Sequence, residues 1–333
     1  MPYAVPPANV VSAQQKPRKP RPLAPGGTIR VIAPSSPFEP ATFAQGILEL
    51  EKLGFQASYG RKLFERDGYL AGSPMDRAAD LREAFTDQDV AAVCCARGGF
   101  GAAELLSLLD DFPFSVFEHP KIFLGFSDAT VLQSYLWRRA SWITFHGPMV
   151  AAGFFAGADL PAGFDLESFT RAVQSADETW SIDLRGETLR PGDAEGLILG
   201  GCLTVLEMTL GTKWEFDSES SILLLEDRSM KPYQVDRSLL HLRQAGKFNG
   251  VRGIVLGDFP ECEAPAANGL AAMDIFRRYF EKMDIPVVAG APFGHTARAM
   301  MTLPLGVRGR LRADNGAGGT QIEILESACS ILT

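Results

Sequence analysis

Ser127 lies in the stretch KIFLGFSDATVLQSYL of residues 121–136, at the boundary between two segments of different pattern. The first half is an apolar run typical of a buried strand, and the second half is typical of a helix. A serine on such a turn is raised above the sheet edge, where the helix N-terminus stabilises negative charge. Gly125 and Ala129 are small enough for so tight a turn. Ser127 is therefore a candidate nucleophile, although the stretch alone also fits a serine that only caps the helix.

A glycine-rich turn, RGGFG at residues 97–101, follows another apolar run. Bare backbone N–H groups between a strand and a helix can bind phosphate or stabilise the oxyanion of an acyl-transfer intermediate. The spacing is not that of a dinucleotide-binding G-x-G-x-x-G loop, and no Walker lysine follows, which disfavours phosphate. A tight turn without any ligand would use the same glycines.

A nucleophilic serine needs a base, normally a histidine, and an acid that orients the base. The histidines of the chain are His119, His146, His241 and His295. Two of them, His146 in FHGP and His295 in FGHT, follow predicted strands, and the residues alone do not choose between them. For the acid, Glu226 and Asp227 end the apolar strand SSILLLED, where a carboxylate would reach the sheet edge. An ordinary charged residue at a strand end would look the same.

The surrounding elements predict an α/β protein. Apolar runs alternate with helical patterns over residues 28–146, which indicates βαβ units and a parallel sheet covered on both faces. Ligands bind at the carboxyl edge of such a sheet, where the turns at 97–101, 125–128 and 145–148 should lie together. The expected division is a disordered arm at 1–22, an N-terminal domain at 23–160, a linker region at 161–195 and a C-terminal domain at 196–333.

Composition and charge exclude several classes of protein. The 333 residues are 46% hydrophobic and 22% charged, so they can bury a sizeable core. The net charge is −8, and the basic residues of 1–22 are accompanied by no acid, so the acidic body is a poor binder of nucleic acid. There is no run of 18 apolar residues, so no membrane span is expected, and the N-terminus lacks the apolar segment of a secretory signal.

The five cysteines form no C-x-x-C pair, and no histidine lies at zinc-ligand spacing from them. We therefore expect no metal site, and reduced thiols fit a cytoplasmic protein.

Five stretches taken together resemble the serine LD-carboxypeptidase family, which includes the muramoyltetrapeptide carboxypeptidases and the microcin C immunity hydrolases. They are YLAGSPMDRAADLREAFTDQDVAAVCCARGGFGAAELL, FLGFSDATVL, HGP, LLLEDRSMKPYQVDRSLLHLRQAG and GAPFGHT, in the family's order across residues 25–327. The resemblance implies an N-terminal parallel-sheet α/β domain and a C-terminal domain with a smaller mixed sheet, with the site in the cleft between them. It also implies a cytoplasmic homodimer that needs no metal or other cofactor.

The resemblance also implies roles for individual residues. Ser127 would be the nucleophile of the N-terminal domain, and the C-terminal domain would supply Glu226 and His295. This assignment favours His295 over His146 as the base. The oxyanion hole would be formed by the backbone N–H groups of Gly99 and Asp128.

Substrate recognition is less well defined by the sequence. Arg97 and His146 are candidate substrate contacts, and Arg298 is a second cation near the predicted edge that could meet a terminal carboxylate. Either arginine could equally pair with a structural carboxylate. The family usually has G-G-N-L where residues 200–203 read GGCL, so Cys202 replaces an amide and leaves substrate binding near this turn open.

The function implied is hydrolysis of the L,D amide bond to the terminal D-amino acid of murein tetrapeptide, in peptidoglycan recycling. The alternative within the family is hydrolysis of an acyl-adenylate-like peptide antibiotic, for which Trp180 or Trp214 could stack on adenine. A non-catalytic peptide-binding protein of the same fold is a further alternative, but such a protein would not need Ser127, Glu226 and His295 together. No nucleic acid or membrane partner is expected.

Overall fold

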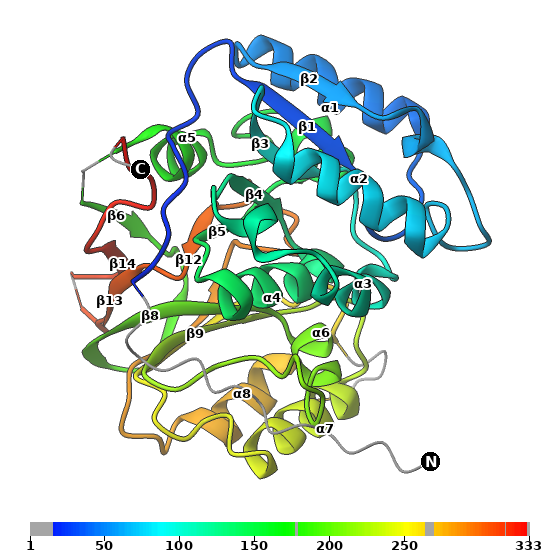
Figure 1. The fold of residues 1–333 in the computed structure, drawn as a ribbon. Helices are drawn as coiled ribbons and strands as arrows, with labels where there is room; N and C mark the ends of the chain where they lie inside the picture. The colour runs from blue at the N-terminus through cyan, green and yellow to red at the C-terminus, as the bar shows by residue number, and fades with distance from the viewer. Residues whose placement is uncertain (1–15, 177–178, 264–269, 317, 332–333) are drawn as a thin grey trace, which may run out of the picture.

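The computed structural model describes residues 16–176, 179–263, 270–316 and 318–331, which form two sheets with helices packed on them (Figure 1). The first sheet consists of β1 (Thr28–Ile32), β2 (Gln56–Tyr59), β3 (Val90–Cys95), β4 (Ile122–Gly125), β5 (Thr144–His146) and β12 (Leu303–Leu305). Its order is β12-β5-β4-β3-β1-β2, and all pairs are parallel except β12 with β5. The predicted parallel-sheet α/β fold is confirmed.

The second sheet consists of β6 (Trp180–Asp183), β7 (Glu187–Arg190), β8 (Gly192–Cys202), β9 (Ser221–Glu226), β10 (Gly253–Gly257), β11 (Val287–Ala291), β13 (Arg308–Ala313) and β14 (Thr320–Ile324). Its order is β6-β14-β13-β8-β9-β10-β11-β7. The strands β8 to β11 are parallel to one another, and the remaining pairs are antiparallel. The second sheet is therefore mixed, as predicted.

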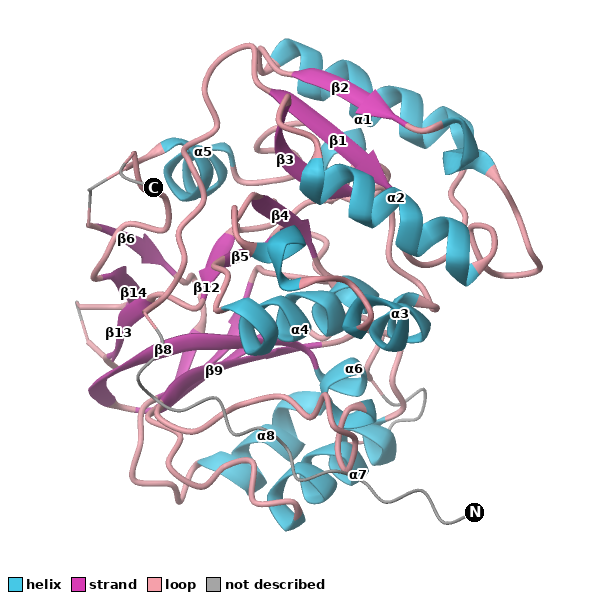
Figure 2. Ribbon diagram, in the orientation of Figure 1, coloured by secondary structure: helices cyan, strands magenta, loops and turns pink. Residues whose placement is uncertain are grey.

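Helices pack on both sheets, and α4 (Thr130–Ala140) lies between the first sheet and strand β8 of the second (Figure 2). The other α-helices are α1 (Pro40–Lys52), α2 (Pro74–Thr86), α3 (Leu106–Asp110), α5 (Leu166–Gln174), α6 (Leu203–Met208), α7 (Pro232–Gln244) and α8 (Ala272–Phe280). Short 3-10 helices are η1 (Arg61–Phe64), η2 (Ala102–Leu105), η3 (Phe114–Phe117), η4 (Ser127–Ala129) and η5 (Phe154–Ala156).

Both faces of the first sheet are buried, which explains its unbroken apolar strands. Neighbouring residues of β3 point to opposite sides. Cys94 packs in the same cluster as Phe43 of α1, whereas Cys95 packs in the cluster of Leu81 of α2 and Leu132 of α4. Because each face needs apolar residues, the strand shows no alternation with polar ones.

The two sheets share one core. Leu223 and Leu225 of β9 pack on the side of α6, α7 and α8. Ile222 and Leu224, the alternating residues of the same strand, belong instead to the cluster that contains Leu124 of β4. This shared cluster fixes the carboxyl ends of β4 and β9 relative to each other.

Three features differ from the expected division of the chain. The expected linker at 161–195 contains α5, β6, β7 and the start of β8. The strand β12 lies within the expected C-terminal domain, yet Leu303 pairs with His146 in the first sheet. The second sheet, expected to be the smaller, has eight strands against six. Strands of three or four residues are too short to give a periodic signal, which is why the sequence did not reveal them.

The expected arm at 1–22 is described only from residue 16, and residues 1–15 lie outside the described part. The Arg18 N–H donates to the Ser141 carbonyl over 2.8 Å, and the Ile143 N–H donates to the Arg18 carbonyl over 3.0 Å. Lys19 forms an ion pair with Glu326 at 3.1 Å. Residues 16–22 are thus attached to the body of the protein and are not a free arm.

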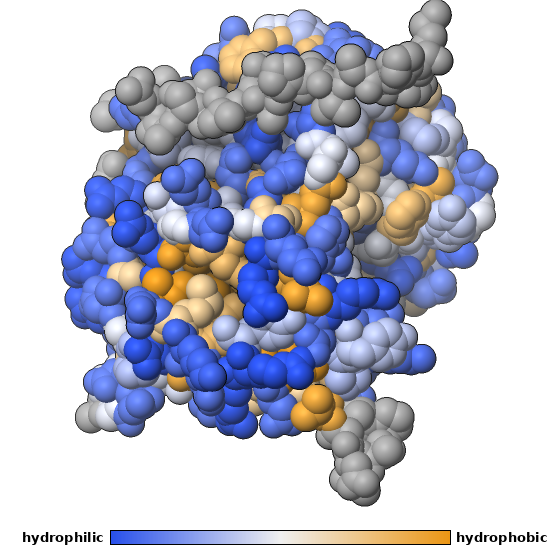
Figure 3. Space-filling model, turned by 90° about the horizontal axis from the view of Figure 1, so that it is seen from below, coloured by the Kyte–Doolittle hydropathy of each residue, from blue (hydrophilic) through white to orange (hydrophobic). Residues whose placement is uncertain are grey.

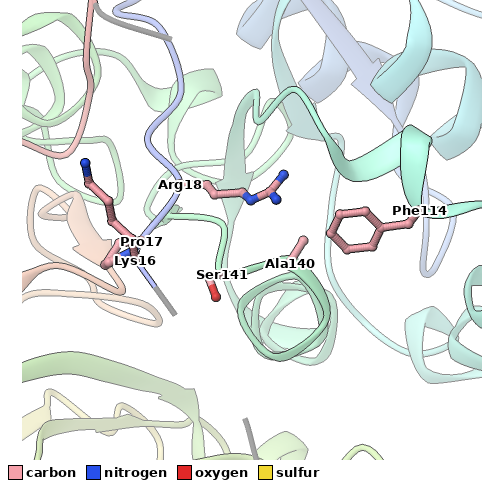
Figure 4. A pocket seen from close by; sticks show the side chains of 6 residues that line it. All are labelled: Lys16, Pro17, Arg18, Phe114, Ala140 and Ser141. Carbon is pink, nitrogen blue, oxygen red and sulfur yellow. The ribbon is translucent and has the colours of Figure 1, made fainter. Parts of the chain in front are cut away.

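A surface hollow of about 410 Å³ lies beside this segment. Within it, the Arg18 side chain extends toward the ring of Phe114 (Figure 4). Its lining is Lys16, Pro17, Arg18, Phe114, Ala140 and Ser141. None of the candidate catalytic residues lines it.

The outer face formed by α7 and α8 is mostly hydrophilic, with apolar side chains gathered in a few patches (Figure 3). The inner sides of these helices supply buried residues such as Leu239, Leu242 and Phe276 to the core. Among the described helices, none is both long and apolar enough to cross a bilayer.

Candidate active site

Ser127 lies on a sharp turn at the carboxyl end of β4. It is the first residue of η4, which leads into α4, and its φ of 61° is in the left-handed region that non-glycine residues seldom adopt. Phe126 occupies the N-cap position, and no side chain caps this helix. Within the described residues, the Ser127 hydroxyl has no hydrogen-bond partner. The alternative that Ser127 caps the helix is therefore wrong, and its hydroxyl stands free before a helix N-terminus.

The turn at 97–101 packs directly against this serine. A Cβ placed on Gly98 would lie 2.8 Å from the Ser127 Oγ and 2.7 Å from its Cβ, so only glycine fits there without displacement. Ser36 holds the turn in place, because its N–H donates to the Gly98 carbonyl (3.3 Å) and its hydroxyl accepts from the Phe100 N–H (3.2 Å). The end of β1 therefore positions the turn beside Ser127.

We predict that Gly98→Ala lowers kcat/KM about 100-fold, because a displacement of about 1 Å at a reacting atom has that effect. The backbone of Gly98 does not have a positive φ, so the added methyl group acts on Ser127 and not on the turn. Gly316→Ala is the matched control, since its Cβ would meet nothing nearer than 3.6 Å. Steady-state kinetics and circular dichroism check this prediction. Full activity in a folded Gly98→Ala protein would contradict it.

Two backbone N–H groups lie near Ser127. The Gly99 N–H has no hydrogen-bond partner among the described residues, and Gly99 has a φ of 112°, which favours glycine. The Asp128 N–H is in the first helical turn, where N–H groups have no partner within the helix. The Asp128 side chain accepts from the Ala102 N–H over 2.8 Å and so ties the start of η2 to η4. Burial raises the pKa of Asp128.

Glu226 and His295 form a hydrogen-bonded pair at the end of the second sheet. Glu226 is fully buried, and its Oε2 accepts from the His295 Nδ1 over 2.7 Å and from the His295 backbone N–H over 2.8 Å. Gly294 makes this approach possible: its φ is 64°, and a Cβ there would lie 2.2 Å from the Glu226 Cδ. The bond at Nδ1 leaves Nε2 of His295 as the nitrogen that can accept a proton.

Each member of this pair changes the proton affinity of the other. Burial alone would raise the pKa of Glu226, but the charge and hydrogen bond of His295 outweigh burial and hold that pKa below its usual value. Burial alone would lower the pKa of His295, but the charge and hydrogen bond of Glu226 raise it above 6.5. His295 is thus a stronger base than a free histidine, as a residue that takes a proton from serine should be.

The structure brings this pair close to Phe126, the residue that precedes Ser127. The ring of Phe126, which precedes Ser127, lies 5.0 Å from the His295 ring between centroids. The end of β8 approaches the same place, because the Cys202 N–H donates to the Thr130 hydroxyl at the start of α4 over 3.1 Å. Within the described residues, no hydrogen bond joins the Ser127 hydroxyl to His295. The turn that carries Ser127 and the turn that carries His295 come from different sheets and meet through the rings of Phe126 and His295.

The three candidate substrate contacts differ in exposure and in their hydrogen-bond partners. Arg97 is exposed and donates to the Pro37 carbonyl over 2.9 Å. His146 is fully buried beside Glu226, so it does not reach a substrate directly. Arg298 pairs with a structural carboxylate, since its Nε donates to Asp258 over 3.1 Å and its Nη2 also bonds to Asp258.

Cys202 is excluded as a nucleophile. It is buried, and its thiol lies 3.5 Å from the Asp227 carboxylate. Burial raises the pKa of Cys202 well above its usual value, and the nearby carboxylates Glu226 and Asp227 add to this effect. The reactive form of cysteine is the thiolate, which these surroundings suppress.

The two tryptophans considered for adenine stacking differ in exposure. Trp180 is buried within β6. Trp214 is half-buried, donates its Nε1–H to Asp110 over 3.1 Å and has the Lys213 ammonium 4.7 Å from its ring centroid. No group of three or more His, Cys, Asp or Glu side chains suited to a metal ion occurs in the described part of the chain.

Sequence reasoning missed Ser36 and Gly98. Ser36 lies in APSSPF after the first strand, and a Pro/Ser turn at the carboxyl edge of a parallel strand was its only signal. Gly98 lies inside RGGFG, a pattern that indicates free backbone N–H groups but not the close contact that Gly98 makes with Ser127. Nothing local to either residue indicates its contact with the other turn.

The chain is similar to known proteins over most of its length. Residues 29–147 match the LD-carboxypeptidase N-terminal domain, and residues 195–311 match the LD-carboxypeptidase C-terminal domain. The chain is 35% identical over 313 residues to a Bacillus subtilis protein named probable murein peptide carboxypeptidase, covering 93% of this chain and 96% of that one. It is 31% identical over 280 residues to murein tetrapeptide carboxypeptidase of Pseudomonas aeruginosa, covering 82% and 89%.

Solved structures show the same fold. A muramoyltetrapeptide carboxypeptidase from Oxalobacter formigenes superposes with a TM-score of 0.76 at 31% identity, covering 90% of this chain and 99% of that one. The microcin C7 self immunity protein MccF in complex with aspartyl sulfamoyl adenosine gives a TM-score of 0.84 at 25% identity, covering 94% and 100%. The chain therefore belongs to the LD-carboxypeptidase family of serine-type hydrolases.

Proposed function

We propose that the protein hydrolyses the L,D amide bond to the terminal D-amino acid of murein tetrapeptide, with Ser127, Glu226 and His295 as a catalytic triad. The observation that carries this proposal is the 2.7 Å bond between Glu226 and the His295 Nδ1, whose ring lies 5.0 Å from that of Phe126, the residue before a serine held at a φ of 61°. A strained serine before a helix N-terminus and a histidine already oriented by a carboxylate are the parts that acyl transfer requires. Catalytic hydrogen bonds are often absent before substrate binds, so the missing bond from Ser127 to His295 is compatible with the proposal.

The mechanism follows from these positions. The Ser127 Oγ attacks the carbonyl carbon while the His295 Nε2 takes its proton, and Glu226 stabilises the resulting imidazolium. The N–H groups of Gly99 and Asp128 stabilise the oxyanion. His295 then gives its proton to the leaving amine of the D-amino acid. Water attacks the acyl ester by the same route and restores the Ser127 hydroxyl.

The pH dependence of kcat/KM follows from the raised pKa of His295. Only the neutral imidazole can take the serine proton, so activity is full above this pKa and is lost as the pH falls through it. We predict an acid limb with a midpoint above pH 6.5, the ordinary value for histidine. A pH profile measured at substrate concentrations below KM tests this. A midpoint below 6.5 would show that Glu226 does not act on His295 in this way.

The substrate assignment draws on the printed names of the Pseudomonas aeruginosa and Oxalobacter formigenes proteins. Mass spectrometry of murein tetrapeptide after incubation with the protein should show loss of one D-alanine and no internal cleavage. The same peptide ending in L-alanine is the control for stereochemistry. An unchanged tetrapeptide in the presence of folded protein would reject this substrate.

A second candidate substrate is an acyl-adenylate-like peptide antibiotic. The superposition with MccF bound to aspartyl sulfamoyl adenosine favours it. The positions of Trp180 and Trp214 do not, because Trp180 is buried and the Lys213 ammonium already lies over the Trp214 ring. Incubation with aspartyl sulfamoyl adenosine, in which an N-acyl bond joins the aspartyl group to the nucleoside, separates the candidates: release of aspartate without turnover of tetrapeptide would favour the antibiotic.

We also propose that the protein acts as a homodimer in the cytoplasm. All five cysteines are free and buried, which fits a reducing compartment. Light scattering during size-exclusion chromatography tests the dimer, and a mass of about 36 kDa at micromolar concentration would contradict it.

A further inference from the structure

His146 is a buried polar side chain that the mechanism above does not use. It has no exposed surface, and within the described residues neither of its ring nitrogens has a hydrogen-bond partner. The Oε1 atom of Glu226 is buried and unpartnered as well. The His146 Nε2 lies 3.7 Å from that oxygen. Two unsatisfied polar groups therefore face each other, at a distance that a small rotation of either side chain closes to a hydrogen bond.

The two oxygens of Glu226 have different partners. Oε2 accepts both bonds from His295, whereas Oε1 accepts no hydrogen bond among the described residues and lies 3.7 Å from the His146 Nε2. A buried carboxylate oxygen without a donor is costly, and His146 is the unpartnered donor that the structure places toward it. A hydrogen bond to one oxygen leaves the Glu226 carboxylate free to rotate. Its orientation toward the His295 ring is fixed only if both oxygens are bonded.

His146 belongs to the sheet of the nucleophile, while Glu226 belongs to the other sheet. In the first sheet, His146 pairs with Gly125 of β4, two residues before Ser127, and with Leu303 of β12. Contact between His146 and Glu226 thus links the orienting carboxylate directly to the strand pair that carries Ser127. The contact between His146 and Glu226 therefore joins the two sheets at the candidate active site.

The surroundings of His146 keep its ring neutral. Burial lowers the pKa of His146 to about 4, although the charge of Glu226 acts in the opposite direction. His295 is the other titratable group that acts on it, and it lowers this pKa further. The rings of Phe126 and Phe293 stand edge-on to His146 at 6.2 and 5.8 Å and supply no charge. A neutral imidazole with its proton on Nε2 can donate to Glu226 without adding a second positive charge.

We propose that His146 is a positioning residue, which donates its Nε2–H to the Oε1 of Glu226 and so fixes the carboxylate that orients His295. This inference rests on the proposed triad. Since a donor to Glu226 draws negative charge away from Oε2, His146 also moderates the basicity of His295. Loss of the donor should make His295 more basic and move the acid limb of kcat/KM to higher pH.

Two variants of His146 separate positioning from packing. In His146→Gln, the side-chain amide nitrogen can occupy the place of Nε2 and donate to Glu226. In His146→Asn, the shorter amide reaches only the place of Nδ1. Both variants bury one neutral amide, so they should lower the stability of the protein by similar amounts. Thermal unfolding measures this loss. We expect His146→Asn to lower kcat/KM at least about tenfold, as loss of a residue that orients a catalytic group does, with recovery in His146→Gln.

The pH profile is the second readout. In His146→Asn the acid limb should move upward by about half a pH unit, and in His146→Gln it should return toward the wild-type position. Equal losses in both variants, with unchanged acid limbs, would overturn the proposal and leave His146 as a packing residue.

NMR titration of His295 tests the same proposal without turnover. In the Ser127→Ala background, the pKa of His295 should be higher with His146→Asn than with His146 or His146→Gln. An identical pKa in all three proteins would overturn the positioning role. Failure of the triad itself is distinguishable, because it would appear as retained activity in Ser127→Ala with His146 intact.

Discussion

Ser127→Ala should reduce kcat on the order of 10⁴- to 10⁶-fold, since the covalent route is lost when the nucleophile is removed. The fold should survive, because the Ser127 hydroxyl has no hydrogen-bond partner among the described residues. Alanine must still adopt the left-handed φ of 61°, which costs about 1 kcal/mol and leaves a folded protein. Release of D-alanine from tetrapeptide under saturating substrate measures the effect.

Ser107→Ala is the matched control for this prediction. Ser107 is an exposed serine within α3, and its replacement should leave both activity and unfolding temperature unchanged. A residual kcat in Ser127→Ala within tenfold of wild type would mean that water attacks the amide directly. The serine would then serve only to shape the turn.

Glu226→Gln should lower kcat on the order of 10⁴-fold, as loss of the orienting carboxylate does in triads of this kind. The Oε2 of Glu226 accepts two N–H groups of His295, and a glutamine can do so only by turning its amide nitrogen toward His146. The imidazolium formed during attack would also lose its neighbouring negative charge. Both effects act on the transition state and less on substrate binding, so KM should change little.

The pH profile of Glu226→Gln gives a second, independent expectation. Without the carboxylate, burial becomes the dominant influence on His295 and lowers its pKa. The acid limb of the residual activity should therefore move to lower pH than in wild type. Note that this shift is opposite in sign to the one expected for His146→Asn.

Glu207→Gln provides the control for Glu226→Gln. Glu207 accepts from the Nδ1 of His241 over 2.9 Å, so the chain contains a second Glu–His pair, on the outside of the second sheet. Removing the charge from that pair should leave kcat and the acid limb unchanged. If both glutamine variants lost activity equally, the loss would reflect stability, and the role of Glu226 as an orienting group would be rejected.

The sequence predicted the first sheet well because each of its parallel strands is buried on both faces. Runs such as VAAVCC and KIFLGF carry this signal locally, and the turns after them must lie at one edge. The start of α2 was equally clear: the Ser73 side chain accepts from the Asp76 N–H over 3.2 Å, with Pro74 first in the helix. These features depend on residues a few positions apart.

The remaining features depend on residues that are far apart in the chain. The pairing of β12 with β5 joins residues 303–305 to residues 144–146, and no local pattern marks it. The choice of His295 over His146 came from the family resemblance, since both histidines follow apolar strands and precede small residues. The structure distinguishes them physically: His295 donates twice to Glu226 and is partly exposed, whereas His146 is fully buried.

Reaction with a fluorophosphonate probe tests the central claim most directly, because the probe modifies only a serine whose hydroxyl is activated by a neighbouring base. After labelling and digestion with trypsin, mass spectrometry should find the adduct on the peptide of residues 122–138, at Ser127, and labelling should cease in Ser127→Ala and slow strongly in Glu226→Gln. A protein that turns over tetrapeptide yet remains unlabelled at Ser127, or that carries the adduct equally in Glu226→Gln, would contradict the triad.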